Sequence, residues 1–184
     1  MNNTNLKNTI ENLINTFLEA GKIAKKISNR GVKITIKSDN SPVTDGDLAV
    51  DEILRKKIQD LTPAIPIISE ETVNLNIENK YKNFWLIDPI DGTKDYIKKK
   101  DEYTLNAALI IDFKPVAGII YAPAKDRLFF SYGKNLAYET LNNKTIQLNC
   151  SKKTSDEIIG LETSNNTPIE ILNIYKKYNV SKTV

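Results

Sequence analysis

The 184-residue sequence contains no histidine and a single cysteine, Cys150. Without an imidazole, the chain cannot use Ser-His-Asp or Cys-His nucleophiles and cannot bind zinc through histidine. One cysteine excludes an intrachain disulfide and favours a reducing compartment, so we expect a cytoplasmic location, with peripheral association with the inner membrane left open. Cys150 is then structural or incidental. Chemistry in this chain must depend on carboxylates, hydroxyls, lysines and backbone amides.

A strong excess of one charge is also missing. The chain has 26 Lys and Arg against 23 Asp and Glu, a net charge of +3. Because the two signs are interspersed, we expect no nucleic-acid binding, and the tract Lys98–Lys100, followed by Asp101 and Glu102, predicts a solvated surface. The polar N-terminus and the short apolar runs predict neither a signal peptide nor a transmembrane segment. With 40% apolar and 27% charged residues, the composition is that of an ordinary soluble globular protein.

Apolar periodicity divides the chain into a helical part and a strand-rich part. Residues 4–27 carry one apolar stripe and predict a long amphipathic helix, residues 32–36 alternate as a strand, and Ser41–Thr44 turns into a second helix. Thr44 and Asp47 are spaced as a capping box. After residue 103 the period becomes two. Strands are predicted at 104–111, 115–121, 127–132, 136–140, 145–148, 157–161 and 179–184, and a helix capped by Thr167 at 167–177. The fold class is α+β.

The informative residues are acidic and follow two short apolar runs, 66–68 and 84–87. Glu70-Glu71 follows the first run, and Asp88-Pro-Ile-Asp91-Gly-Thr93 follows the second. Carboxylates sharing one pocket repel each other, and a divalent cation relieves that repulsion. All-oxygen ligands favour Mg²⁺, Mn²⁺ or Ca²⁺ over zinc.

Backbone groups around the second acidic segment extend this hypothesis. The Ile90 carbonyl could face the same centre, and Gly92 permits an unusual turn. Thr93 and Lys94 then open a short helical stretch whose amides suit a phosphate.

Each of these segments also has a simpler interpretation. Asp-Pro and Asp-Gly are common turn dipeptides, Glu-Glu is often a solvated surface, and Asp47 could be only a capping residue. The ordered combination of three such segments, each after an apolar strand or at the start of a helix, favours a functional site.

Three segments together resemble the inositol monophosphatase superfamily. They are Lys37-Ser-Asp-Asn-Ser-Pro-Val-Thr-Asp-Gly-Asp47, Ile68-Ser-Glu-Glu71 and Trp85-Leu-Ile-Asp-Pro-Ile-Asp-Gly-Thr-Lys94. The resemblance is closest to the CysQ-type 3′(2′),5′-bisphosphate nucleotidases and covers essentially the whole chain. It implies a layered αβαβα sugar-phosphatase fold and a role in sulfur assimilation.

The resemblance also implies a role for each site residue. Glu70, Asp88 and the Ile90 carbonyl match the ligands of a first Mg²⁺. Asp88 bridges to a second Mg²⁺, which Asp91 also binds; intact members hold two or three such ions. Thr93 and Asp47 match the pair that orients and deprotonates the attacking water, and the amides of Gly92 and Thr93 match those that hold the phosphate. Glu71 would assist indirectly, through contacts with the groups that bind the cation. Glu70, Ile90 and Asp91 also border the substrate.

The sequence departs from the family in its length. Members are usually roughly half as long again, and the WDxxAG motif whose aspartate completes the second metal site does not occur here, where Trp85 is the only tryptophan. We therefore expect a metal- and phosphate-binding α+β domain at 1–155, the start of a truncated αβ domain at 156–184, and one well-formed Mg²⁺ site. The chain could be a truncated gene product, a fragment, or a protein that pairs through an unpaired C-terminal strand edge.

The sequence is consistent with three alternative functions. The first is Mg²⁺-dependent hydrolysis of adenosine 3′,5′-bisphosphate to AMP and phosphate by direct attack of water. The second is an inositol or sugar monophosphate phosphatase. The third is a catalytically inactive metal- or phosphate-binding module, which the absent aspartate favours and the intact carboxylates oppose.

Overall fold

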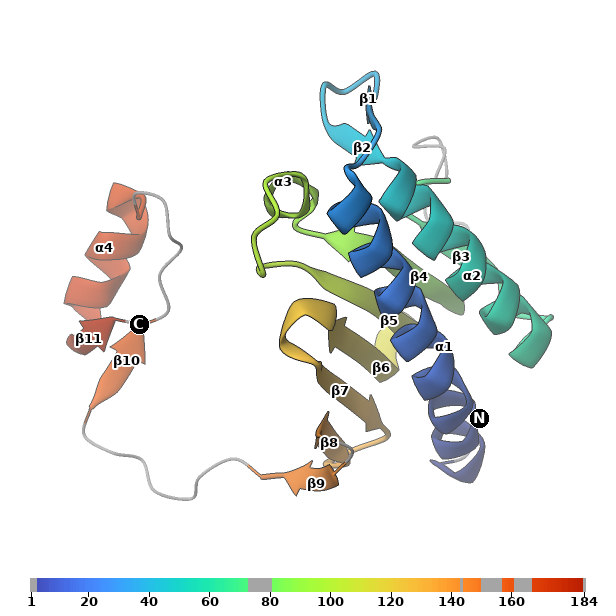
Figure 1. Ribbon diagram of the computed structural model, residues 1–184. Coiled ribbons are helices and arrows are strands. Elements are labelled where there is room, and N and C mark those ends of the chain that lie inside the picture. The colour runs from blue at the N-terminus through green and yellow to red at the C-terminus, as the bar shows by residue number, and fades with distance from the viewer. Residues whose placement is uncertain (1–2, 73–80, 143, 150–156, 161–166, 184) are drawn as a thin grey trace. The chain divides into compact units, whose positions relative to one another are not determined.

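The computed structural model describes residues 3–72, 81–142, 144–149, 157–160 and 167–183 (Figure 1). The chain separates into two compact units, Met1–Leu148 and Asn149–Val184. Cys150 lies outside the described residues. The elements of the first unit are α1 (Asn3–Arg30), β1 (Ile34–Ile36), β2 (Pro42–Thr44), α2 (Asp45–Leu61), β3 (Ile67–Ser69), β4 (Phe84–Asp91), α3 (Thr93–Ile97), β5 (Thr104–Ile111), β6 (Lys114–Ala122), the 3₁₀ turn η1 (Pro123–Lys125), β7 (Arg127–Tyr132), β8 (Ala137–Leu141) and β9 (Lys144–Leu148). Those of the second unit are β10 (Ile158–Gly160), α4 (Ile169–Lys177) and β11 (Val180–Thr183).

Both predicted N-terminal helices are confirmed. The apolar stripe of α1 is buried from Leu6 to Ile27, and the helix continues to Arg30. At the start of α2, the Thr44 hydroxyl accepts hydrogen bonds from the amides of Gly46 (3.1 Å) and Asp47 (3.3 Å). The Asp47 carboxylate accepts one from the Thr44 amide at 2.8 Å. The predicted capping box therefore fixes the first turn of α2.

A seven-stranded sheet forms the body of the first unit. Its strand order is β3-β4-β5-β6-β7-β8-β9; β3 and β4 run parallel, and all later neighbours are antiparallel, as the period-two pattern predicted. In Figure 1, α1 and α2 lie side by side over one face of this sheet. Trp85 and Phe17 are fully buried between the two layers, and the Trp85 indole donates to the Thr62 hydroxyl at 3.0 Å. The α+β class is confirmed.

Two boundaries differ from the sequence-based predictions. Pro42–Thr44 does not simply turn into the helix, because it first forms β2, which pairs antiparallel with β1. The predicted Thr167 cap is wrong: α4 begins at Ile169, and no side chain caps it. The cause is Pro168, whose extended ψ of 146° keeps it outside the helix.

The second unit is small. It consists of α4 and a two-stranded parallel sheet in which β11 pairs with β10. The α4 side chains Ile169, Leu172 and Ile174 are exposed. Self-association through β11 stays a prediction.

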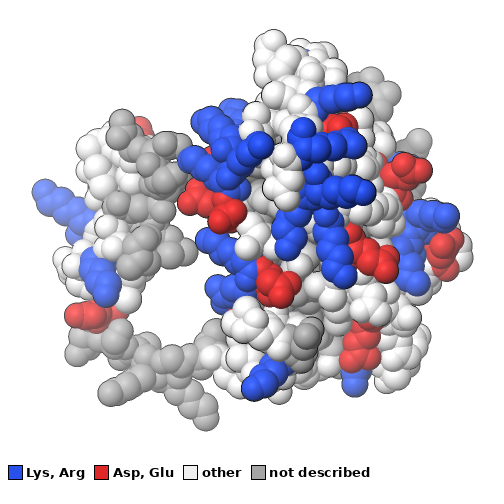
Figure 2. Space-filling view, viewed as in Figure 1, with Lys and Arg blue, Asp and Glu red and all other residues white. Residues whose placement is uncertain are grey.

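Charged side chains of both signs lie on the surface of the first unit. Figure 2 shows Lys and Arg side chains gathered over the face that α1 and α2 form, with Asp and Glu between them. Lys98–Lys100 is exposed as predicted, and Lys100 pairs with Asp95 at 3.1 Å. None of the helices in the described part of the chain has the length and apolar character that a membrane span requires.

Candidate active site

A bulge in β4 brings the two aspartates of the Asp88–Asp91 segment to one face of the sheet. Asp88 pairs with Asn106 of β5 and Asp91 with Thr104, and the register shifts between them. Four residues of β4, 88–91, thus lie opposite three of β5, 104–106, at the point where Pro89 lacks an amide for the ladder. In a regular strand, residues three apart point to opposite faces. Because Asn106 and Thr104 share a face of β5, their partners share one too.

The Glu70-Glu71 pair lies in a turn that β4 holds directly. β3 ends at Ser69, and the Thr72 amide donates to the Ser69 carbonyl at 3.1 Å to close the turn. The Glu70 amide donates to the Ile87 carbonyl at 3.1 Å. Glu70 is thereby fixed beside the residue that precedes Asp88. The parallel pairing of β3 and β4 explains why two segments distant in sequence end at the same place.

These carboxylates are close enough to disturb one another. Burial raises the pKa of Asp88 to about 7, helped by the charges of Glu70 and Asp91, a hydrogen bond with Glu70 and the charge of Asp47. The Asp88 Oδ1 atom is buried and has no hydrogen-bond partner. An unpartnered buried carboxylate oxygen surrounded by like charges is unfavourable, and positive charge placed there would relieve it.

Asp47 and Thr93 meet beside this cluster, as predicted from the two separate motifs. The Thr93 hydroxyl lies 3.1 Å from Asp47 Oδ1 and 3.0 Å from the Ile90 carbonyl oxygen, either of which can accept its proton. Asp47 Oδ2 accepts from the Thr44 hydroxyl at 2.5 Å. Burial raises the pKa of Asp47, and the hydrogen bonds from Thr44 and Thr93 oppose that rise. This arrangement can orient a hydroxyl group or a water and accept a proton.

Gly92 makes the turn between β4 and α3 possible. Its φ of 94° lies in the left-handed region, and this is the unusual turn that the glycine was expected to permit. The amides of Asp95 and Tyr96 donate to the Gly92 carbonyl, and those of Gly92 and Thr93 lie at the N-terminus of α3, where the first amides of a helix have no partner within it. The Tyr96 hydroxyl donates to the Ala24 carbonyl at 2.7 Å and anchors α3 to α1.

We expect Gly92→Ala to destabilise the fold far more than Gly31→Ala, although both glycines have a φ of 94°. A Cβ at Gly31 meets nothing within 4 Å, so only the backbone penalty of about 1–2 kcal/mol applies. A Cβ at Gly92 would lie 2.7 Å from the Glu102 carbonyl oxygen. The added overlap brings the loss to ~3 kcal/mol or more. Urea unfolding of the two variants checks this; equal losses would contradict the close approach to Glu102.

Two neighbours of the site received no role from the sequence. Lys37, at the end of the β1 strand, lies 2.9 Å from Glu71 and 3.5 Å from Glu70. Asn106 donates from Nδ2 to Asp91 Oδ2 at 3.4 Å, and its own buried Oδ1 has no partner. Lys37 is the first residue of the motif Lys37–Asp47, so the sequence could have pointed to it. Asn106 lies in none of the motifs, and only its pairing with Asp88 across β4 and β5 places it at the site.

The donor set fits a hard divalent cation. Glu70, Asp88, Asp91 and the Ile90 carbonyl offer oxygen atoms only, and the unpartnered Asp88 Oδ1 stands among them. Within the described ranges, no three Asp, Glu or Cys side chains are placed together so that they could hold a metal ion without rearranging. Glu70 is half exposed and lies near Lys37, so binding a cation would require it to turn from that partner.

The sequence and the fold both match known proteins. The profile of the inositol monophosphatase family matches residues 5–183. The 3′(2′),5′-bisphosphate nucleotidase CysQ of Buchnera aphidicola is 37% identical over 146 residues, which are 73% of this chain and 55% of that protein. The crystal structure of CysQ from Bacteroides thetaiotaomicron has a TM-score of 0.69 at 26% identity and covers 96% of this chain and 72% of that one. An IMPase/NADP phosphatase solved with NADP and Ca²⁺ has a TM-score of 0.74 at 18% identity, covering 97% and 67%.

The chain therefore belongs to the inositol monophosphatase family. Its layered α+β fold is the fold of those neighbours. The chain spans about half the length of the curated relatives that it matches.

Proposed function

We propose that this chain carries the catalytic residues of a Mg²⁺-dependent phosphatase that hydrolyses the 3′-phosphate of adenosine 3′,5′-bisphosphate to AMP and phosphate. The observation that supports it most directly is the buried, unpartnered Asp88 Oδ1, with Glu70 and Asp91 close enough to raise the pKa of Asp88. All the residues concerned belong to the unit Met1–Leu148. The CysQ relatives supply the choice of substrate.

In this proposal Glu70, Asp88 and the Ile90 carbonyl would hold a first cation, and Asp88 and Asp91 would hold a second. When bound, Mg²⁺ supplies charge neutralisation for the phosphoryl oxygens and the leaving oxygen. A neighbour of the same fold was solved with Ca²⁺, another cation that prefers oxygen ligands. The carboxylates also concentrate negative charge in one place, and a bound cation would relieve their mutual repulsion.

The Asp47–Thr93 pair acts on the water. Thr93 Oγ1 lies 3.1 Å from Asp47 Oδ1, so the hydroxyl can pass its proton to the carboxylate while accepting one from the attacking water. The capping box holds Asp47 through Oδ2, which leaves Oδ1 for this task. The amides of Gly92 and Thr93 at the start of α3 would hold the phosphate oxygens.

Phosphate release tests the proposal. With Mg²⁺, we expect the 184-residue polypeptide to release phosphate from adenosine 3′,5′-bisphosphate faster than from inositol 1-phosphate, and EDTA to stop both reactions. Faster hydrolysis of inositol 1-phosphate would contradict the substrate assignment. Turnover that persists in EDTA would contradict the role of the cation.

A further inference from the structure

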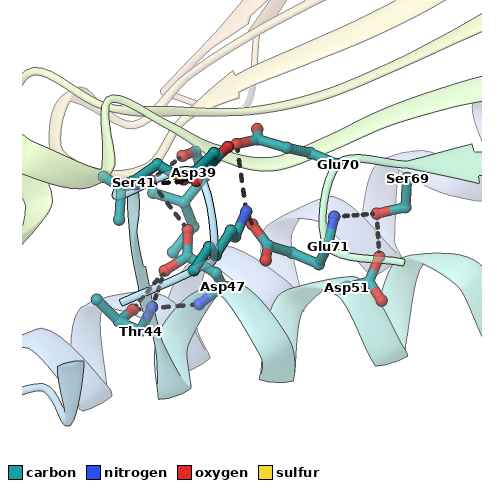
Figure 3. Close-up of polar contacts among 11 residues, drawn as sticks. Asp39, Ser41, Thr44, Asp47, Asp51, Ser69, Glu70 and Glu71 are labelled. Atoms are coloured by element: carbon teal, nitrogen blue, oxygen red, sulfur yellow. Dashed lines mark hydrogen bonds and ion pairs between the residues drawn. The ribbon is translucent and has the colours of Figure 1, made fainter. Parts of the chain in front are cut away.

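We propose that Ser69 and Asp51 are positioning residues that fix the turn carrying Glu70 to helix α2. The inference rests on the proposed function, because it concerns how Glu70 is placed for a cation. Figure 3 shows the link: Asp51 on α2 faces Ser69 at the end of β3, and Ser69 in turn meets the Glu71 backbone.

Both groups of this link are buried. Ser69 is completely inaccessible to solvent, and Asp51 is 5% exposed. The Ser69 hydroxyl donates to Asp51 Oδ1 at 2.5 Å and accepts from the Glu71 amide at 3.4 Å. One hydroxyl thus bridges a helix side chain and the backbone of the turn.

The turn needs such an anchor because the Glu70 side chain is half exposed and is not held by packing. The hydrogen bond from the Glu70 amide to the Ile87 carbonyl fixes the position of Glu70 along β4. This bond does not tie it to α2. The Ser69–Asp51 bond does so, and Asp47 stands on the same helix one turn before Asp51. The link therefore sets the distance between the proposed cation ligands and the proposed water-activating pair.

Stability alone gives little reason for a carboxylate at Asp51. Among the described residues, the ion-pair partner of its second oxygen is the partly exposed Arg55, whose Nε lies 3.3 Å away. Taking a carboxylate out of water is costly, and replacing buried ionic groups by apolar ones of similar size is often neutral or stabilising. A geometric role accounts for the buried carboxylate at this place.

The test compares cation affinity with stability in three variants and a control. Ser69→Ala removes the bridge, and Asp51→Leu removes the acceptor while filling a similar volume. Asp51→Asn keeps an acceptor oxygen for Ser69. Thr62→Ala is the matched control: it deletes another buried hydroxyl, the one that accepts from Trp85 at the other end of β4.

Calorimetric titration with Mn²⁺ and Mg²⁺, beside thermal unfolding in EDTA, gives both quantities. We expect Ser69→Ala and Asp51→Leu to weaken cation binding about tenfold or more, the usual effect of removing a group that orients a ligand. Asp51→Asn should stay within about threefold of the parent because the acceptor remains. Thr62→Ala should lower Tm without changing cation affinity.

Cation affinity within twofold of the parent in Ser69→Ala would overturn the proposal, whatever Tm does. Equal weakening in Thr62→Ala would overturn it as well, since the effect would then be one of general stability. Should Asp51→Leu not fold, Ser69→Ala and Asp51→Asn decide the question. A parent that binds cations but releases no phosphate would contradict the proposed function alone, because the affinity comparison still holds. A parent that binds no cation would overturn both.

Discussion

Asp88→Asn should abolish phosphate release by the 184-residue polypeptide, to at least ~10³-fold below the parent. In the proposed site Asp88 is the carboxylate shared by both cations, so the substitution removes charge from two places at once. The loss of one cation's stabilisation of the transferring phosphoryl group amounts to several kcal/mol, and each ~1.4 kcal/mol is tenfold in rate. Steady-state release of phosphate from adenosine 3′,5′-bisphosphate measures the effect.

The same substitution should leave the fold intact. Asn removes a half-buried charge that Glu70 and Asp91 repel, so unfolding in EDTA should require at least as much urea as for the parent. Asp60→Asn, an exposed position near the end of α2, is the control and should change neither quantity. Turnover of Asp88→Asn within about threefold of the parent, a factor worth less than ~1 kcal/mol, would show that Asp88 does not bridge the cations.

One Mg²⁺ should bind this 184-residue polypeptide well and a second one poorly. Glu70, Asp88 and the Ile90 carbonyl serve the first site, and water can complete its octahedral shell. The second site has only Asp88 and Asp91 among the assigned ligands, so its cation must depend on the substrate phosphate. Calorimetric Mg²⁺ titration with and without adenosine 3′,5′-bisphosphate distinguishes the two sites.

The weak second site should reduce kcat more than it reduces substrate binding. The second cation would stabilise the leaving oxygen, an interaction that is stronger in the transition state than in the ground state. We expect kcat to fall at least ~10²-fold below that of a full-length CysQ relative, by analogy with the loss of one electrostatic stabiliser elsewhere. Two tight sites with ordinary turnover would show that another residue, or a partner chain, replaces the aspartate of the WDxxAG motif; Asn106, which donates to Asp91 Oδ2, is one candidate.

Local features of this protein were predictable from its sequence. The apolar stripe of α1, the capping box at Thr44 and the alternation of β5 and β7 each depend on residues within a few positions of one another. The unusual turn at Gly92 belongs to the same group. Propensity, capping chemistry and periodicity act over such short distances, so the sequence alone identifies these elements. The grouping of Asp47, Glu70, Asp88, Asp91 and Thr93 was suggested by motif resemblance.

Only the tertiary structure decided how these residues meet. Strand periodicity would put Asp88 and Asp91 on opposite faces of β4, and the bulge between the Asp88–Asn106 and Asp91–Thr104 pairs brings them together. The extended backbone of Pro168 keeps that residue outside α4, so Thr167 does not cap the helix. The Ser69–Asp51 bond joins residues 18 positions apart, and the Lys37–Glu71 pair joins residues 34 apart. Such contacts depend on which strands pair and on how α2 packs across the sheet, and no local pattern of residues encodes that choice.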